Sequence, residues 1–243
     1  MFRHLFILTL TAMVSPGRTC RSPLSDVDIT DPSLIRPKIV VRKLVNYLGS
    51  LSQRFEASFF DSNGNAVELK NGDVAVNGVS MSLTTSLLTA APGYVLNTAS
   101  LLQVALDSTY TFVTTLADGQ QINSVITMQE KNLFDFIAPT RHPKATDLLI
   151  TWKEGDARYR IILSLLAHIA RDLTDRFENE TINLPDPASE QFAIPASFFT
   201  SSDSIFRVDM TLTTKSTGNV NSQFRSGGEI TSRFSIERRV LID

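Results

Sequence analysis

Apolar and polar residues alternate with a period of two through most of this chain, which is the pattern of a β-strand with one buried face. The pattern is clearest between Leu106 and Met128, LDSTYTFVTTLADGQQINSVITM. Two alternating segments, Tyr110–Leu116 and Ile122–Met128, flank a stretch that contains Asp118 and Gly119. This arrangement predicts a β-hairpin, and it indicates an all-β chain.

The length of the connecting loop decides which faces of the two strands match. A two-residue turn at Asp118 and Gly119 would place the aromatic side chains of the first strand on the same side as the polar residues of the second. A three-residue loop, Ala117–Gly119, with Gly119 in the left-handed conformation of a G1 bulge, brings Ile122, Ile126 and Met128 to the aromatic side instead. We predict the three-residue loop.

Tyr110 follows a predicted turn at Asp107–Thr109. Immunoglobulin-like and fibronectin-like sandwiches place a corner tyrosine in such a position, and its hydroxyl group bonds to the backbone a few residues upstream. We therefore expect the Tyr110 hydroxyl group to bond to the preceding loop.

Turn residues separate short alternating segments throughout the first half of the chain, at DSNGN (Asp61–Asn65), Asn71-Gly72 and Asn77-Gly78. After a polar break, QEKN, the alternation restarts and continues to the C-terminus. We predict an all-β fold of two tandem immunoglobulin-like, Greek-key β-sandwiches, residues 38–130 and 131–243.

Four parts of this predicted body allow specific expectations. Trp152, the sole tryptophan, ends an alternating segment and is expected to anchor the core between sheets. Leu163–Leu173 has apolar residues at helical spacing and is open to a helix or a strand. Ile230–Ile242 alternates almost strictly and predicts a terminal strand able to lie at a sheet edge. Ile39–Leu51 is expected to begin as a strand, while its second half is left open.

The first residues have the layout of an export signal. Residues 1–19 carry Arg3, an apolar run and then Ser15-Pro16-Gly17, and the run is too short to span a bilayer. Cys20, the only cysteine, stands where a bacterial lipoprotein signal would end, so its thiol could accept a diacylglycerol group. The alternative is ordinary cleavage near Gly17 with Cys20 as an incidental thiol. Residues 20–37 contain three prolines without a sustained period and predict a tether.

Composition is ordinary for a globular protein, with 42% hydrophobic and 20% charged residues. Removal of Arg3 and Arg18 with the leader takes the formal net charge from −2 to about −4. A surface that binds phosphates needs an excess of cations, so the charge argues against nucleic acid as a partner.

No motif in the chain points to catalysis. His142 and His168 lack the spacing of a zinc site, and the chain has no nucleophile elbow or glycine-rich phosphate loop, so we expect no cofactor and no catalytic residue. Asp61, Asn63 and Asn65 imitate the start of a calcium loop, but the sharp-turn glycine and the bidentate glutamate are missing, which favours a hairpin turn.

Charged pairs elsewhere are interpreted as solvated surface. Asp172 with Asp175, or Glu178 with Glu180, would suit a glycosidase only at a defined carboxylate separation in a cleft. Arg238 and Arg239 are expected on the solvent side of the last strand, where they would discourage edge-to-edge pairing.

The Cys20 leader, the proline-containing tether and the segments FDSNGN, TYTFVTTLADGQ and IPASFF together resemble the small envelope lipoproteins of Bacteroides-type bacteria, many of which have immunoglobulin-like or fimbrillin-like domains. The resemblance implies lipid anchoring at Cys20, a place in the outer membrane or at the cell surface, and a binding or structural role.

Three functions are compared. The first is a non-enzymatic, lipid-anchored envelope protein that binds a glycan or a protein. The second is a fimbrial or accessory subunit in which Ile230–Ile242 or Ile39–Val45 is exchanged with a neighbouring copy. The third is a hydrolase on a β-scaffold, which would need a deep pocket with convergent acids.

Overall fold

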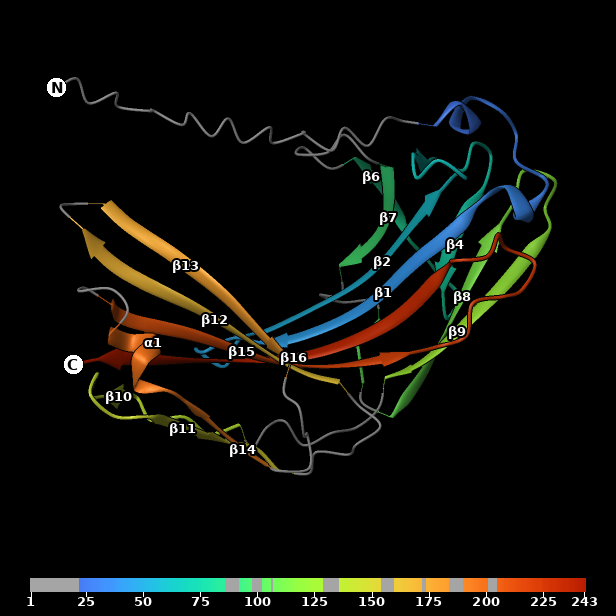
Figure 1. The fold of residues 1–243 in the computed structure, drawn as a ribbon. Coiled ribbons are helices and arrows are strands. Elements are labelled where there is room, and N and C mark those ends of the chain that lie inside the picture. The colour runs from blue at the N-terminus through green and yellow to red at the C-terminus, as the bar shows by residue number, and fades with distance from the viewer. Residues whose placement is uncertain are drawn as a thin grey trace, which may run out of the picture.

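The computed structural model describes residues 22–85, 92–97, 102–105, 107–128, 136–153, 160–171, 174–183, 190–200 and 205–243. Nearly all regular elements in these ranges are β-strands (Figure 1), so the all-β prediction is confirmed. The helical elements of the described part are short: the 3-10 turns η1 (Pro23–Asp26) and η2 (Pro32–Leu34), and the helix α1 (Ala196–Thr200).

The largest sheet has ten strands, and its main path follows the order β13-β12-β15-β16-β1-β2-β7-β6. The bounds of these strands, in chain order, are β1 (Arg36–Val45), β2 (Leu51–Phe60), β6 (Ser82–Thr85), β7 (Pro92–Asn97), β12 (Arg160–Arg171), β13 (Thr174–Asn183), β15 (Ile205–Thr217) and β16 (Glu229–Ile242). Two further short strands pair off this path, β3 (Ala66–Val67) with β2 and β10 (Arg141–His142) with β16.

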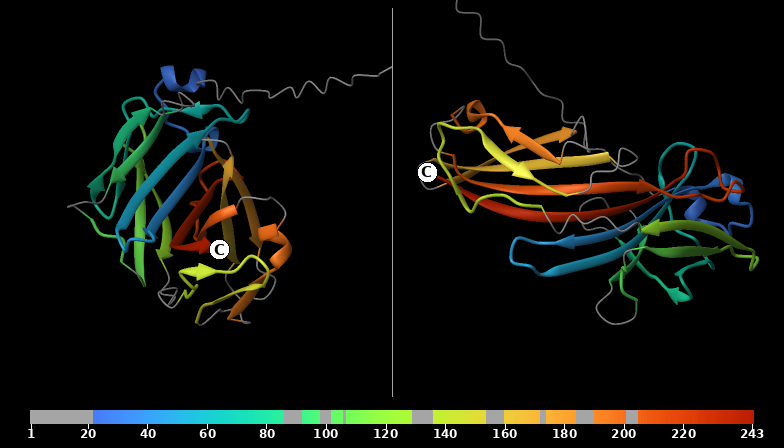
Figure 2. Two further views of the ribbon diagram at one scale, coloured as in Figure 1. Left: turned by 90° about the vertical axis from the view of Figure 1, so that its left-hand side faces the viewer. Right: turned by 90° about the horizontal axis from the view of Figure 1, so that it is seen from below.

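Two smaller sheets complete the fold. One has the strand order β5-β4-β8-β9, formed by β4 (Asp73–Val76), β5 (Val79–Ser80), β8 (Ser108–Thr115) and β9 (Gln121–Met128). The other pairs β11 (Leu148–Thr151) with β14 (Gln191–Ile194). Figures 1 and 2 show β11 and β14 beneath the β15 and β16 side of the large sheet, and the four-stranded sheet at the other end of the molecule.

The first and the last long strands of the chain lie side by side in the middle of the large sheet. β1 pairs with β16 in parallel, from Lys38 opposite Glu229 to Val45 opposite Ile236. The sheet therefore contains strands from both predicted sandwiches. The predicted boundary at residues 130 and 131 falls outside the described residues and stays a prediction.

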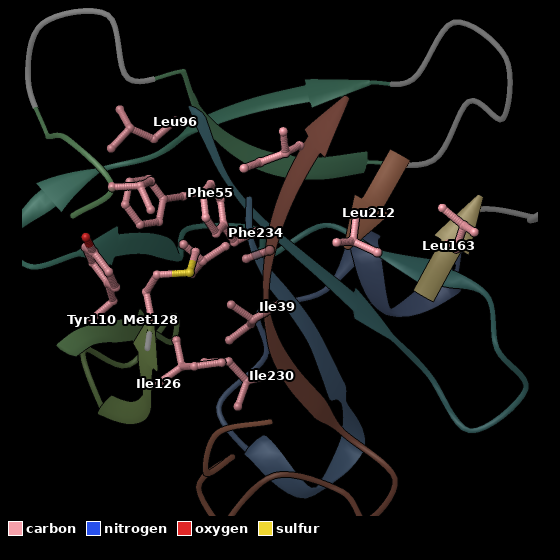
Figure 3. Packing of buried hydrophobic residues seen from close by; sticks show 14 of the residues in the cluster. Ile39, Phe55, Leu96, Tyr110, Ile126, Met128, Leu163, Leu212, Ile230 and Phe234 are labelled. Atoms are coloured by element: carbon pink, nitrogen blue, oxygen red, sulfur yellow. The ribbon is translucent and has the colours of Figure 1, made fainter. Parts of the chain in front are cut away.

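The core lies between the large sheet and the two smaller ones. Phe55 of β2 packs against Tyr110 and Phe112 of β8, with ring centroids 5.0 and 6.1 Å apart. Figure 3 shows Phe55 and Tyr110 in the same cluster as Ile126 and Met128 from β9 and Ile230 and Phe234 from β16. Trp152 is 2% exposed within the same hydrophobic cluster, which confirms its predicted place in the core.

The β8–β9 hairpin has the predicted register. Tyr110 stands opposite Ile126, the Leu116 N–H group donates to the Gln120 carbonyl oxygen at 2.9 Å, and Gly119 has a φ of +86°. The three-residue loop is therefore confirmed. The Tyr110 hydroxyl oxygen accepts from the Ala105 N–H group at 2.6 Å, so the expected bond to the upstream loop is also confirmed.

The tether prediction is wrong for residues 22–37, because this segment packs on the body. The Ser22 N–H group donates to the Ala66 carbonyl oxygen at 2.8 Å, and the Ala117 N–H group donates to Ile29. Ile29 and Ile35 are buried in the core. Two of its three prolines, Pro23 and Pro32, begin η1 and η2, where a missing N–H group costs nothing, and Pro37 lies in β1.

The helical alternative is wrong for residues 163–171, which lie in β12. Leu163, Leu165, Ala167 and Ile169 are all buried, the period of a strand, and pairing with β13 and β15 on both sides overrides the helical spacing. Ile39–Leu51 contains the end of β1, a turn at 46–50 and the first residue of β2.

The last strand is not an edge strand. β16 lies between β15 and β1, and β1 lies between β16 and β2. Ile230–Ile242 and Ile39–Val45, the two segments considered for exchange between copies, therefore pair with each other inside one sheet. The fimbrial alternative gains no support from this arrangement.

Candidate functional site

One face of the large sheet points away from the core, and we call it the outer face. On β15, Val208, Met210 and Leu212 are buried against the core, so Asp209 and Thr211 point to the outer face. The clefts formed by described residues on this face include one at the β12–β15–β16 end and another over β2, β6 and β7.

The first, which we call the Tyr47 cleft, has a volume of about 260 Å³. Its lining combines an aromatic ring, two hydroxyl groups and two carboxylates with aliphatic surface: Tyr47, Ser164, Leu165, Leu166, Asp209, Thr211, Glu237 and Arg238. The hydroxyl groups and carboxylates come from β12, β15 and β16, whereas Tyr47 comes from the turn between β1 and β2.

The sequence of this turn fixes the position of Tyr47. The Asn46 side-chain oxygen accepts from the N–H groups of Leu48 and Ser50 at 3.0 and 2.8 Å. The Asn46 and Ser50 backbones are bonded at 2.9 Å, and Gly49 supplies the left-handed residue with a φ of +80°. Tyr47 is 40% exposed at the top of this closed turn.

Arg239 links the Tyr47 ring to a carboxylate. Its guanidinium carbon lies 3.6 Å from the centre of the Tyr47 ring, which is the distance of a stacked cation–π contact. The same guanidinium donates from Nε and Nη2 to the two oxygens of Asp209 at 2.7 and 3.1 Å. The planar fork of arginine therefore orients both the ring and the carboxylate.

Asp209 holds its negative charge within a ring of cations. Burial favours the neutral form, but hydrogen bonds from Arg239 and the positive charge of Arg207 outweigh it and hold the pKa of Asp209 below its ordinary value. His168 Nε2 also lies 3.0 Å from Asp209 Oδ2. A carboxylate so stabilised stays ionised at neutral pH and accepts hydrogen bonds, so it suits binding better than proton transfer.

His168 connects this carboxylate to Arg207. It is 4% exposed, and Arg207 Nη2 lies 2.7 Å from its Nδ1 atom. The same Nη2 atom lies 2.8 Å from Nε2, so the guanidinium contacts both ring nitrogens of His168. The histidine therefore orients charged groups beneath the cleft rather than entering it.

The second, which we call the Arg54 cleft, is larger, at about 490 Å³, and polar. Its lining residues are Arg54, Glu56, Ser58, Thr84, Thr85, Pro92, Gly93, Tyr94, Val95 and Asn97. Glu56 accepts from Arg42 at 3.1 Å and from Arg54 at 2.9 Å, which fixes one carboxylate between two guanidinium groups. The Tyr94 hydroxyl group points elsewhere, because it accepts from the Leu69 N–H group at 3.0 Å.

The residues singled out from the sequence lie in several places. Cys20 and Asp172 fall outside the described residues, as do the side chains of Asp175 and Glu178. His142 is buried beside Phe199 at 5.5 Å between ring centroids, and its Nε2 atom bonds to the Thr146 carbonyl oxygen.

The prediction that both terminal arginines are solvent-facing is wrong. Arg238 lies over the Phe136 ring at 5.7 Å and donates to the Phe136 carbonyl oxygen, so it packs against the layer below the sheet. Arg239 faces outward, but it contacts Asp209 and Tyr47, which both line the Tyr47 cleft. Neither arginine prevents pairing at a sheet edge, because β16 is an interior strand.

The DSNGN segment forms the expected hairpin turn between β2 and β3. Asp61 accepts from the N–H groups of Asn63 and Asn65 at 2.8 and 2.9 Å, and from the Ser22 hydroxyl group at 2.7 Å. Its oxygens are therefore used within the turn and in holding the N-terminal segment.

No pattern in the sequence singles out Tyr47, Asp209 or Glu237. Alternation places Asp209 and Glu237 on the polar faces of their strands, but only the pairing of Asp209 with Arg239 and of Thr211 with Glu237 brings them together. Within the described ranges, no cluster of His, Cys, Asp and Glu has the arrangement of a metal site. Among those residues, too, no helix combines the length and the apolar character needed to cross a membrane.

Comparison with known proteins returned a structural neighbour. No family model and no curated protein sequence matches the chain. Among solved structures, the chain is similar to SGBP-B of the Bacteroides ovatus mixed-linkage glucan utilization locus, which was solved in complex with a mixed-linkage heptasaccharide. The alignment has a TM-score of 0.22 and 12% identity, and it covers 90% of this chain and 64% of that one, less than two thirds of its length.

Proposed function

We propose that this protein is a binding module of the cell envelope and that it binds a glycan in the Tyr47 cleft. The observation that carries the proposal is the Tyr47–Arg239–Asp209 stack, in which a half-exposed aromatic ring and an ionised carboxylate are held in one fixed arrangement. A sugar ring presents a C–H face that packs on an aromatic ring, and its hydroxyl groups bond to carboxylates and to Ser and Thr hydroxyls. The cleft supplies each of these groups.

Binding fits the cleft better than hydrolysis. A glycosidase needs one carboxyl group that keeps a proton near neutral pH, which requires a raised pKa. Asp209 does not suit that role, because hydrogen bonds from Arg239 and the charge of Arg207 hold its pKa below the ordinary value against the effect of burial. We therefore assign Asp209 the role of a hydrogen-bond acceptor for sugar hydroxyl groups.

Tyr47→Ala tests this function. We expect the full mature chain to bind members of a glycan array, and Tyr47→Ala to weaken that binding at least tenfold in titration calorimetry. Leu48→Ala is the matched control, because Leu48 is 73% exposed on the same turn and lies outside the cleft. Unchanged affinity in Tyr47→Ala, or an equal loss in Leu48→Ala, would place the binding site elsewhere.

We also propose that Cys20 carries the lipid that holds this module in the outer membrane. Ser22 is fixed to the body by its bonds to Ala66 and Asp61, so the two residues from Cys20 to Ser22 reach roughly 7 Å. A lipidated Cys20 would hold the body close against the membrane at its η1 end rather than on a long tether.

Mass spectrometry of the mature N-terminus tests the anchor. We expect an acylated cysteine at the first position in the wild type and an unprocessed or soluble chain in Cys20→Ala. A wild-type N-terminus that begins before Cys20 and carries no acyl group would contradict lipid anchoring and would favour cleavage near Gly17.

A further inference from the structure

Four cationic residues form a line across the outer face. Lys215 of β15 pairs with Arg233 of β16, Arg233 pairs with Arg42 of β1, and Arg42 pairs with Arg54 of β2. Paired residues on neighbouring strands point to the same face of a sheet. We call these four residues the cation row. In the backbone register, Arg160 of β12 stands opposite Lys215 at the end of the row.

The row carries more positive charge than its surroundings balance. Glu56 forms ion pairs with Arg42 and Arg54, while Lys215 and Arg233 have no ion pair with any residue in the described ranges. Four cations against one carboxylate leave three uncompensated positive charges. Like charges on directly opposite residues destabilise a sheet, so this row costs stability in the free protein.

Arg233, in the middle of the row, is set into the face rather than extended from it. Its Nε atom is buried, and it has no hydrogen-bond partner among the residues that the structure describes. An unsatisfied buried donor on an uncompensated cation is unfavourable for folding alone. An anion bound to the row would offset its uncompensated charge at the accessible guanidinium groups of Arg42 and Arg54, whose side chains are 48% and 47% exposed.

Hydroxyl groups and a polar cleft border the row. Two residue pairs along the ladder toward the Tyr47 cleft, and on the same face, Thr213 and Ser235 lie with their hydroxyl oxygens 2.8 Å apart. At its other end the row enters the Arg54 cleft through Arg54 itself. Gly93 leaves that cleft open, because a Cβ atom there would lie 3.2 Å from the Ser58 hydroxyl oxygen.

We propose that the cation row binds an acidic glycan, a polysaccharide whose sugar units carry carboxylate groups. The inference rests on the proposed function and names the chemical class of its ligand. Three strand spacings give the row a length of roughly 14 Å, which suits a single extended chain crossing the strands. Arginine forks bind carboxylates in a bidentate manner, and the flanking hydroxyls and clefts accommodate the sugar rings.

A membrane surface or a nucleic acid fits these observations less well. A bilayer surface offers no sugar hydroxyl groups, whereas the row is flanked by the Thr213 and Ser235 hydroxyls and by the polar Arg54 cleft. A nucleic-acid surface needs a broad basic area, whereas the chain as a whole has a formal net charge of −2.

Titration calorimetry with hexagalacturonate tests the proposal, with fully methyl-esterified hexagalacturonate as the uncharged form of the same chain. Hyaluronan hexasaccharide is a second carboxylated probe. We expect the mature wild-type chain to bind at least one acidic probe ten or more times tighter than the ester, with an affinity that falls as salt rises. Arg42→Gln with Arg233→Gln should remove this preference.

The control is Lys70→Gln with Lys144→Gln, which removes the same charge away from the cation row. Urea unfolding should show that the Arg42 and Arg233 variant stays folded and no less stable, since repulsion is relieved. Loss of acidic binding in the Lys70 and Lys144 control would overturn the proposal.

The outcomes separate this inference from the proposed function. If the protein bound the acid and its ester equally well, and Tyr47→Ala removed this binding, the proposal that the cation row binds acidic glycans would be overturned. The proposal that the Tyr47 cleft binds a glycan would stand. Failure of the wild type to bind either acidic probe, while neutral array glycans bind, would have the same two consequences. Tighter binding to phosphatidylglycerol vesicles or to DNA would overturn the acidic-glycan proposal in favour of those partners.

Discussion

The guanidinium group of Arg239 lies between the Tyr47 ring, 3.6 Å from its centre, and the Asp209 carboxylate, which Nε reaches at 2.7 Å. This one side chain joins a turn between β1 and β2 to the outer face of β15. Its position means that the aromatic and acidic groups of the cleft are coupled, and a change in either one alters the support of the other.

Replacement of Asp209 by Asn should destabilise the protein by about 1–3 kcal/mol, because Arg207 and Arg239 lose the charge that they share. Asp118→Asn on the exposed β8–β9 loop should change stability by less than about 0.5 kcal/mol. Urea unfolding at pH 7 measures both. Equal stability of the wild type and Asp209→Asn would show that the carboxylate is not held as described.

The difference in unfolding free energy between the wild type and Asp209→Asn should depend on pH, because the pKa of Asp209 is lowered. Hydrogen bonds and nearby arginines hold this pKa below 3.8 against the effect of burial. A group whose pKa is lower in the folded state adds stability above its unfolded pKa, and that stability is lost as the pH falls through the folded value. The gap between the wild type and Asp209→Asn should therefore narrow below about pH 4. A gap that widened in acid would contradict the assignment.

Alkaline pH should destabilise the protein through Tyr94. Burial raises the pKa of Tyr94 to about 12, although the hydrogen bond with Leu69 opposes the shift. Because the folded state holds this proton more tightly, its stabilising effect is present below about pH 10 and is lost between pH 10 and 12. Unfolding free energies of the wild type should fall over this range, and those of Tyr94→Phe should lack this part of the fall. If the unfolding free energies of the wild type and Tyr94→Phe fell in parallel between pH 10 and 12, the contribution of Tyr94 would be refuted.

Local patterns in the sequence predicted what depends on neighbours along the chain. Alternation identified the strands, and the β8–β9 loop was placed correctly because Gly119 and the two faces of the hairpin leave one register that buries all the apolar residues. Alternation alone did not decide residues 163–171, where helical and strand spacing overlap and pairing with β13 and β15 settles the outcome.

Relations between distant residues could not be predicted in this way. The parallel pairing of β1 with β16 joins Lys38 to Glu229, and no feature near either residue encodes it. The cation row and the Tyr47 cleft depend on that pairing, so each of their residues looked like an ordinary solvated charge or turn residue in the sequence. For the same reason the sequence predicts a tether at the N-terminal segment, because its partners Ala66 and Asp61 are about forty residues away.

Gly119→Val should cost about 1–2 kcal/mol or more, because a branched side chain disfavours the left-handed conformation at a φ of +86°. No atom lies within 4 Å of the Cβ position there, so the cost comes from the backbone rather than from a clash. Gly119→Asn should cost less, since asparagine adopts this conformation more readily. Urea midpoints compare the three proteins, and identical midpoints for Gly119→Val and the wild type would refute the bulged loop.

Separate expression of residues 22–130 and 131–243 tests whether the two predicted sandwiches are independent domains. β1 pairs with β16, and Ile39 is buried beside Ile230. Separation of the halves would therefore leave each with a long unpaired strand edge and exposed apolar surface. We therefore expect each half alone to aggregate or to lack cooperative unfolding, and co-expressed halves to form a soluble complex. Their circular dichroism and thermal unfolding, beside those of the intact chain, give the measurement. Two monomeric halves that each unfold cooperatively would instead support the predicted two-domain division, with β1–β16 pairing as a contact between domains.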